Sequence, residues 1–114
     1  MRQIFEKNMR ILANLLSFCH TLGGKSFQID LDPGLLTSHI VINAEIPDID
    51  LTKLEEFREA LQYPRRRELE QNYWYLGGES ELGSNLTLVA AMIDEVSVTY
   101  AEGILTVKVS RDES

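Results

Sequence analysis

The residues best suited to bind another molecule lie in one segment, positions 64–76. Arginine, tyrosine and tryptophan are enriched at binding hot spots, and this segment combines all three types. The candidate binding residues are Arg65, Arg66, Arg67, Tyr73, Trp74 and Tyr75. On a helix, Tyr73 would belong to the inward stripe, while Trp74 and Tyr75 would project more than about 110° to either side of its centre. Either such a helix is covered on both sides, or one of these two rings is offered to a partner.

The three arginines also carry charge where a helix disfavours it. Arginines in the first turn oppose the helix macrodipole, so an anion or an acidic partner would relieve that cost. The alternative is that Glu68 and Glu70 neutralise the arginines and that the aromatic rings cover a sheet edge. Only the first interpretation makes the segment a binding site.

The one cysteine and the two histidines do not form a recognisable metal or nucleophile site. Zinc takes three or four ligands, and Cys19 and His20, adjacent on a predicted helix, point about 100° apart. Cys19 lies in an apolar arc, which predicts a buried and unreactive thiol. His39 lies on the polar face of a predicted strand, where we expect a solvated imidazole. The sequence therefore predicts no catalytic residue, no metal site and no cofactor.

Two acidic pairs and a glycine-lysine-serine run have structural explanations. Asp32, two residues after Asp30, begins a turn, and Asp50, two residues after Asp48, fits a helix N-cap, so turns and caps are favoured over a cation site. The run Gly24-Lys25-Ser26 lacks the glycine that a phosphate-binding loop needs five residues earlier, because a cysteine stands there.

The charge balance argues against nucleic acid and membrane as partners. The 114 residues include 11 Lys and Arg against 18 Asp and Glu, a net charge of -7. Affinity for phosphate backbones comes mainly from clustered positive charge. Residues 1–24 are interrupted by polar and charged side chains, unlike a signal peptide or a membrane span. A single cysteine cannot form an internal disulfide. We expect a cytoplasmic protein whose partner is another protein or a second copy of itself.

The first predicted element is a helix over residues 2–22, ended by Gly23-Gly24. Its apolar side chains fill about half the helix circumference, which is wider than a minimal amphipathic stripe. So wide an arc predicts packing on a sheet and also on a second helix or on another copy of the protein.

Two strands, residues 25–31 and 36–46, are predicted to follow around a turn at Asp32-Pro33-Gly34. Pairing Leu31 with Leu36 places both apolar sets on one face of the hairpin. The inward set is Phe27, Ile29, Leu31, Ile40, Ile42, Ala44 and Ile46.

Asp50 is predicted to cap a second helix, whose inward stripe is Leu54, Phe57 and Leu61. Pro64 predicts a kink or a fresh helix over residues 64–76, ended by two glycines.

The C-terminal third predicts a hairpin over residues 95–101 and 104–110, joined by Glu102-Gly103. Pairing Ala101 with Ile104 matches valine with valine on one face and threonine with threonine on the other. Residues 85–93 are ambiguous, and their Leu, Thr and Val content favours a strand over a short helix.

Together these elements predict one domain, residues 1–114, of the α+β class: an antiparallel sheet built from two hairpins, with helices packed on one face. We expect a non-enzymatic cytoplasmic interaction module (an adaptor, a regulator or an assembly chaperone) that forms a homodimer. The alternative is a small-ligand-binding or enzymatic domain with an anion-accepting pocket near Arg65–Arg67.

Overall fold

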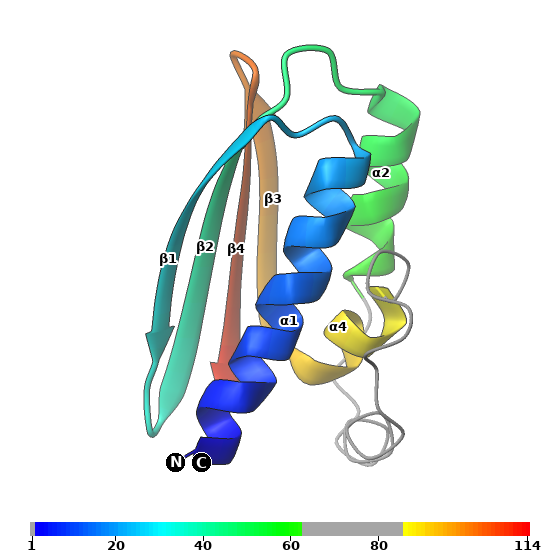
Figure 1. Ribbon diagram of the computed structural model, residues 1–114. Helices are drawn as coiled ribbons and strands as arrows, with labels where there is room; N and C mark the ends of the chain where they lie inside the picture. Colours follow the sequence, from blue (N-terminus) through cyan, green and yellow to red (C-terminus); the bar gives the residue numbers. More distant parts are fainter. Residues whose placement is uncertain (1, 63–85) are drawn as a thin grey trace.

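The computed structural model describes residues 2–62 and 86–114, where three helices cover one face of a four-stranded antiparallel sheet (Figure 1). In chain order the elements are α1 (Arg2–Thr21), β1 (Ser26–Pro33), β2 (Thr37–Glu45), α2 (Leu51–Ala60), α4 (Leu86–Met92), β3 (Glu95–Ala101) and β4 (Ile104–Asp112). The strand order is β1-β2-β4-β3, so each hairpin contributes one inner and one edge strand. The predicted α+β fold is confirmed. The helix predicted over residues 64–76 lies outside the described residues.

α1 ends as its two glycines predict. Gly23 has a φ of 103°, and the Gly24 N–H donates to the Cys19 carbonyl at 3.0 Å, which together form a Schellman end. The helix packs on β1 and β2 and also contacts α4. A second helix of the same chain therefore covers much of the wide apolar arc.

The first hairpin adopts a different register from the predicted one. Leu31 pairs with Ile40, so the predicted pairing with Leu36 was wrong by four residues. β1 continues through Pro33 and the chain turns afterwards, at Gly34, where a Cβ atom would lie 2.3 Å from a backbone carbonyl oxygen. Because the shift is even, each side chain keeps its predicted face.

The second hairpin has the predicted register. Ala101 pairs with Ile104, and Val98 pairs with Val107. Both turn residues have positive φ, 52° at Glu102 and 79° at Gly103. This is the backbone of a tight hairpin turn, which leaves no slack for an alternative pairing.

α2 begins at the predicted cap. The Asp50 carboxylate accepts hydrogen bonds from the Thr52 N–H at 2.9 Å and the Lys53 N–H at 3.3 Å. Its inward stripe is buried as predicted and consists of Leu54, Phe57 and Leu61. Phe57 stacks on Phe18 of α1 with ring centroids 4.9 Å apart, which ties the two helices together.

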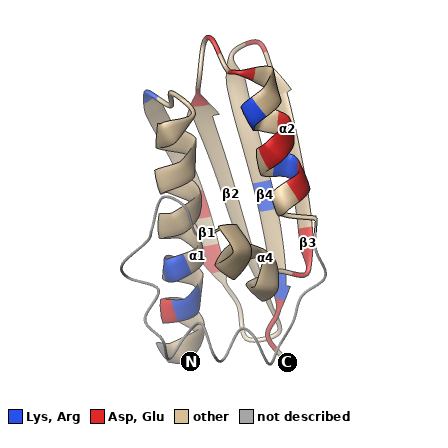
Figure 2. Cartoon of the chain, turned by 90° about the vertical axis from the view of Figure 1, so that its right-hand side faces the viewer, with Lys and Arg blue, Asp and Glu red and all other residues tan. Residues whose placement is uncertain are grey.

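α4 overturns the strand prediction for residues 85–93. Leu88, Val89, Ala90, Ala91 and Met92 are all buried, and the helix contacts both α1 and α2. Figure 2 shows α4 between these two helices, over the middle of the sheet. A helix buried on every side has no polar face, so its sequence shows no amphipathic period to separate it from a buried strand.

Candidate functional site

The six residues predicted to bind a partner lie outside the described residues; they are Arg65, Arg66, Arg67, Tyr73, Trp74 and Tyr75.

Cys19 is buried within the helical layer, and burial raises the pKa of its thiol to about 12. The thiolate is the reactive form of cysteine, so this position is inert, as predicted. His20 is exposed at the end of α1, and His39 is exposed on the sheet. In residues 2–62 and 86–114, no three His, Cys, Asp or Glu side chains gather in a way that could hold a metal ion.

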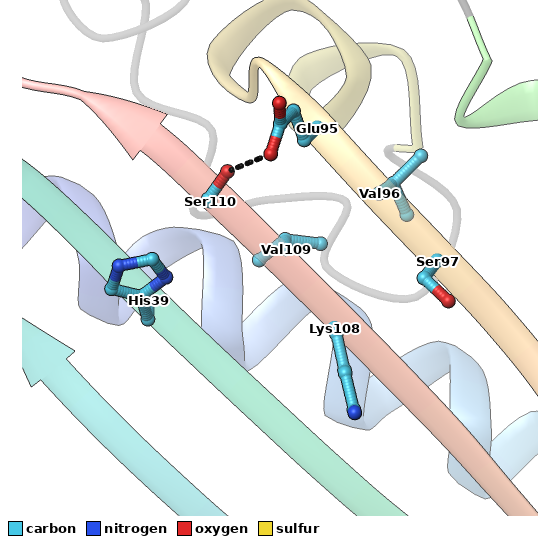
Figure 3. A pocket seen from close by; sticks show the side chains of 7 residues that line it. All are labelled: His39, Glu95, Val96, Ser97, Lys108, Val109 and Ser110. Atoms are coloured by element: carbon cyan, nitrogen blue, oxygen red, sulfur yellow. Dashed lines mark hydrogen bonds between the residues drawn. The ribbon is translucent and has the colours of Figure 1, made fainter.

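The outer face of the sheet, opposite the helices, is polar. An open depression of about 500 Å³ lies on β2, β4 and β3 (Figure 3). It is lined by His39, Glu95, Val96, Ser97, Lys108, Val109 and Ser110. His39 and Ser110 are cross-strand partners, and Ser110 is also the partner of Glu95 on β3.

His39, Ser110 and Glu95 lie in one row across the three strands, which resembles a serine nucleophile beside a base. The hydrogen bonding of Ser110 does not fit that role. The Ser110 hydroxyl donates to a Glu95 carboxylate oxygen at 3.3 Å, not to His39. Activation of a serine needs a hydrogen bond from its hydroxyl to the base. The N–H groups of a sheet point along the sheet into the ladder, so they cannot stabilise an oxyanion above its face. The depression is thus part of a hydrated polar surface.

Of the seven exposed large apolar side chains among the described residues, five belong to α1, β1 and the turn after β1, and the other two are Leu51 and Ile104. In α1, Phe5 is 47% exposed and Met9 is 40% exposed, and Ile29 of β1 is 45% exposed. The turn between β1 and β2 adds Leu35 at 60% and Leu36 at 73%. We call these five residues the apolar corner. Contiguous exposed apolar surface marks interaction sites on soluble proteins.

The direction in which α1 packs places Phe5 and Met9 on the β1 side. Phe18 stacks on Phe57 of α2, and Figure 2 shows α2 on the opposite side of the helical layer from β1. At 100° per residue, Met9 projects about 180° from Phe18, and Phe5 about 140° from it. Both side chains therefore point away from α2, towards the edge formed by β1.

A buried polar cluster fixes this end of α1 against the sheet. Asn8 lies between Phe5 and Met9 in sequence, and its amide donates to the Ser38 hydroxyl at 3.1 Å and to the Glu113 carboxylate at 3.2 Å. Ser38 Oγ donates to the same carboxylate at 2.6 Å. The cluster therefore joins α1, the start of β2 and the chain after β4.

Arg111 completes the cluster through two parallel hydrogen bonds to Glu113, 2.9 Å from Nε and 3.1 Å from Nη2. Both side chains are only 3% exposed. Burial by itself would raise the pKa of Glu113, but the hydrogen bonds from Arg111, Ser38 and Asn8 and the charge of Arg111 outweigh it and lower that pKa. Glu113 is thus held as a carboxylate near neutral pH.

Sequence reasoning did not find the apolar corner or the polar cluster. Ile29 was predicted to lie in the packed face, but it is half-exposed because β1 is an edge strand. The cluster did leave a signal in the sequence. Side chains two residues apart in a strand point to the same face. Ser38 lies two residues before the buried Ile40, and Arg111 lies two residues after the buried Val109, so both polar side chains point inward.

The fold and this surface together define a two-layer α+β domain with a polar outer sheet face and an apolar corner beside one sheet edge. None of the described helices has the length and apolar character needed to cross a membrane. No protein-family model, curated protein or solved structure matches the chain.

Proposed function

We propose that this protein is a non-enzymatic interaction module that forms a homodimer through the apolar corner. The observation that carries the proposal is the gathering of Phe5, Met9, Ile29, Leu35 and Leu36 on one side of the fold, each 40% exposed or more. Apolar side chains at the centre of an interface and a polar rim around it are the usual composition of such surfaces.

The rigid support beneath the corner favours the same function. Glu113, Ser38 and Asn8 hold the start of α1 to the sheet, so Phe5 and Met9 are displayed on a fixed backbone. A surface that is already ordered loses less conformational entropy when it binds. We place the module in the cytoplasm, which is supported by its single cysteine and acidic charge.

The native mass tests this proposal. Light scattering over a range of concentrations is expected to give twice the chain mass of 13.0 kDa. The double variant Phe5→Glu/Met9→Glu is expected to be a monomer, because it places charge on the corner without touching the buried core. The matched control is Leu51→Glu, since Leu51 is 66% exposed at the start of α2 and lies outside the corner. A wild-type protein that remains monomeric at high concentration would contradict the proposal.

A further inference from the structure

The pairing of β2 with its two neighbours, β1 and β4, fixes which backbone groups of β1 face outward. The Ile46 N–H donates to the Gly103 carbonyl at 2.8 Å, so even-numbered residues of β2 bond to β4 and odd-numbered ones bond to β1. Through the register of the first hairpin, odd-numbered β2 residues pair with even-numbered β1 residues. The outward N–H and C=O groups of β1 therefore belong to Phe27, Ile29 and Leu31.

Pro33 is also an odd-numbered residue of β1, so its backbone nitrogen faces outward, which agrees with the outward position of Phe27, Ile29 and Leu31. Proline has no N–H and is tolerated in an edge strand where that position would face solvent. Among residues 2–62 and 86–114, no hydrogen bond is made to the outward backbone groups of Phe27, Ile29 or Leu31. Within the described part of the chain, β1 thus offers an open strand edge.

α2 contacts the opposite edge of the sheet through one hydrogen bond. The Arg58 guanidinium of α2 donates to the outward carbonyl of Val98 in the middle of β3 at 3.1 Å. Tyr100, on the same strand, anchors its hydroxyl to the Ile46 carbonyl at 2.6 Å. Soluble proteins block exposed strand edges because such edges pair with other chains. An open edge beside exposed apolar side chains has the properties of an interface.

We propose that β1 pairs antiparallel with β1 of a second copy about a two-fold axis at Ile29, so that two four-stranded sheets join into one. This inference rests on the proposed function and names the geometry of that self-association.

The residues of β1 match one another in this register. Leu31 faces the partner's Phe27 on the helix side of the sheet, and Asp30 faces the partner's Gln28 on the outer side. Cross-strand pairs of this kind, apolar with apolar and acid with amide, stabilise a sheet. A two-fold axis at Asp30 would instead place two carboxylates directly opposite each other, which is destabilising. An axis at Gln28 would shorten the ladder and set Leu31 against the partner's Lys25.

The helical layer supplies the cover for this seam. Phe5 and Met9 project from α1 towards β1, and Ile29 is half-exposed on the same side of the sheet. In the joined sheet both copies of α1 flank the axis, with Phe5 and Met9 towards the Pro33 end of each β1, because Asn8 bonds to Ser38, the cross-strand partner of Pro33. One contact would therefore bury the half-exposed Ile29 side chain and bond the outward backbone groups of β1.

A second copy fits this edge better than an unrelated strand. A peptide from another protein could bond to the same backbone groups, but nothing on β1 would fix its register. When β1 pairs with β1 of a second copy, apolar residues lie opposite apolar ones, and neither Asp30 nor Asp32 lies opposite an aspartate of the partner. The charge of -7 on each copy opposes association only over a short range, since the Debye length is about 8 Å at physiological ionic strength.

Disulfide trapping of the register tests the seam. The pair formed by Gln28 and the partner's Asp30 is a non-hydrogen-bonded pair, in which Cα atoms lie about 4.5 Å apart, within disulfide range. Gln28→Cys and Asp30→Cys variants are purified separately, then oxidised alone and as an equimolar mixture. We expect a disulfide-linked dimer in the mixture and none in either variant alone. Native Cys19 is buried and inert and does not interfere.

The matched control uses the opposite edge, where Arg58 is bonded to the Val98 carbonyl. Ser97→Cys and Thr99→Cys have the same spacing on β3, and their mixture is expected to stay unlinked. A linked dimer of Asp30→Cys alone or Gln28→Cys alone would overturn the register. A wild-type dimer whose mixture of the β1 variants gives no link would overturn the seam but leave the interaction module standing. A monomeric wild type would overturn both, and would leave β1 open to a strand from another protein.

Discussion

Removing the charge of Glu113 is expected to destabilise the fold strongly although the residue lies at the end of the described chain. In Glu113→Gln the side chain keeps its size, but Arg111 loses the carboxylate that accepts two of its hydrogen bonds. Ser38 and Asn8 lose the same charged acceptor. The perturbation is therefore electrostatic and leaves the packing of the cluster almost unchanged.

The expected loss of stability in Glu113→Gln follows from the burial of the ion pair between Arg111 and Glu113. Arg111 and Glu113 are each 3% exposed, and breaking a buried ion pair costs about 3–5 kcal/mol. Because Arg111 also donates to the Met92 carbonyl, the lower end, about 3 kcal/mol, is the better estimate. For 114 residues the entropy of unfolding is about 0.24 kcal/mol/K, so Tm should fall by about 12 °C.

The stability that Glu113 contributes to the fold is expected to decrease as the pH falls. The pKa of Glu113 is lower in the folded protein than its ordinary value of 4.5. A lowered folded pKa contributes stability that is fully present above the unfolded value and is lost as the pH falls through the folded value. The stability difference between wild type and Glu113→Gln is therefore largest near pH 7 and narrows below about pH 4.5.

Urea unfolding of both proteins at pH 7 and below pH 4 measures the two effects. The matched control is Glu56→Gln on the exposed side of α2, which is expected to change stability by less than about 0.5 kcal/mol. The reasoning is refuted if Glu113→Gln unfolds within that margin of wild type at pH 7. A difference that grows as the pH falls would also refute it.

Two further predictions concern the helices. Asp50→Ala removes the cap of α2 and is expected to lower stability by about 1 kcal/mol, whereas Asp48→Ala should have little effect; thermal unfolding by circular dichroism compares them. Cys19 has a thiol pKa of about 12, so at pH 8 its thiolate fraction is on the order of a thousandfold below that of an exposed cysteine. Labelling by a thiol reagent should therefore follow global unfolding, and rapid modification of the native protein would contradict the assigned burial.

The two hairpins show what local sequence can determine. Glu102-Gly103 makes a turn too tight to slip, so alternation alone fixed the register of β3 and β4. The first hairpin has a longer turn after Pro33, and registers that differ by an even number present the same faces. Alternation cannot choose between such registers, which is why the faces were predicted correctly and the pairing was not.

The candidate site depended on information that no local pattern contains. Ile29 alternates with its neighbours as a core residue does, and its exposure follows from the strand order β1-β2-β4-β3. The contact of α2 with the β3 edge likewise needs Arg58 and Val98, which are 40 positions apart, to meet. Edge and centre are properties of the assembled sheet, and a single sequence gives no direct view of that order.

The structure also changes the reason for expecting self-association. The wide apolar arc of α1 was the sequence argument for a second copy, but α4 and Phe57 cover most of that arc within one chain. What stays exposed is the strip formed by Phe5 and Met9, and that strip lies beside the open edge of β1. A helix strip alone would accept many apolar partners. Joined to an edge whose own residues match in antiparallel register, the strip supports the proposal that the partner is a second copy of the chain.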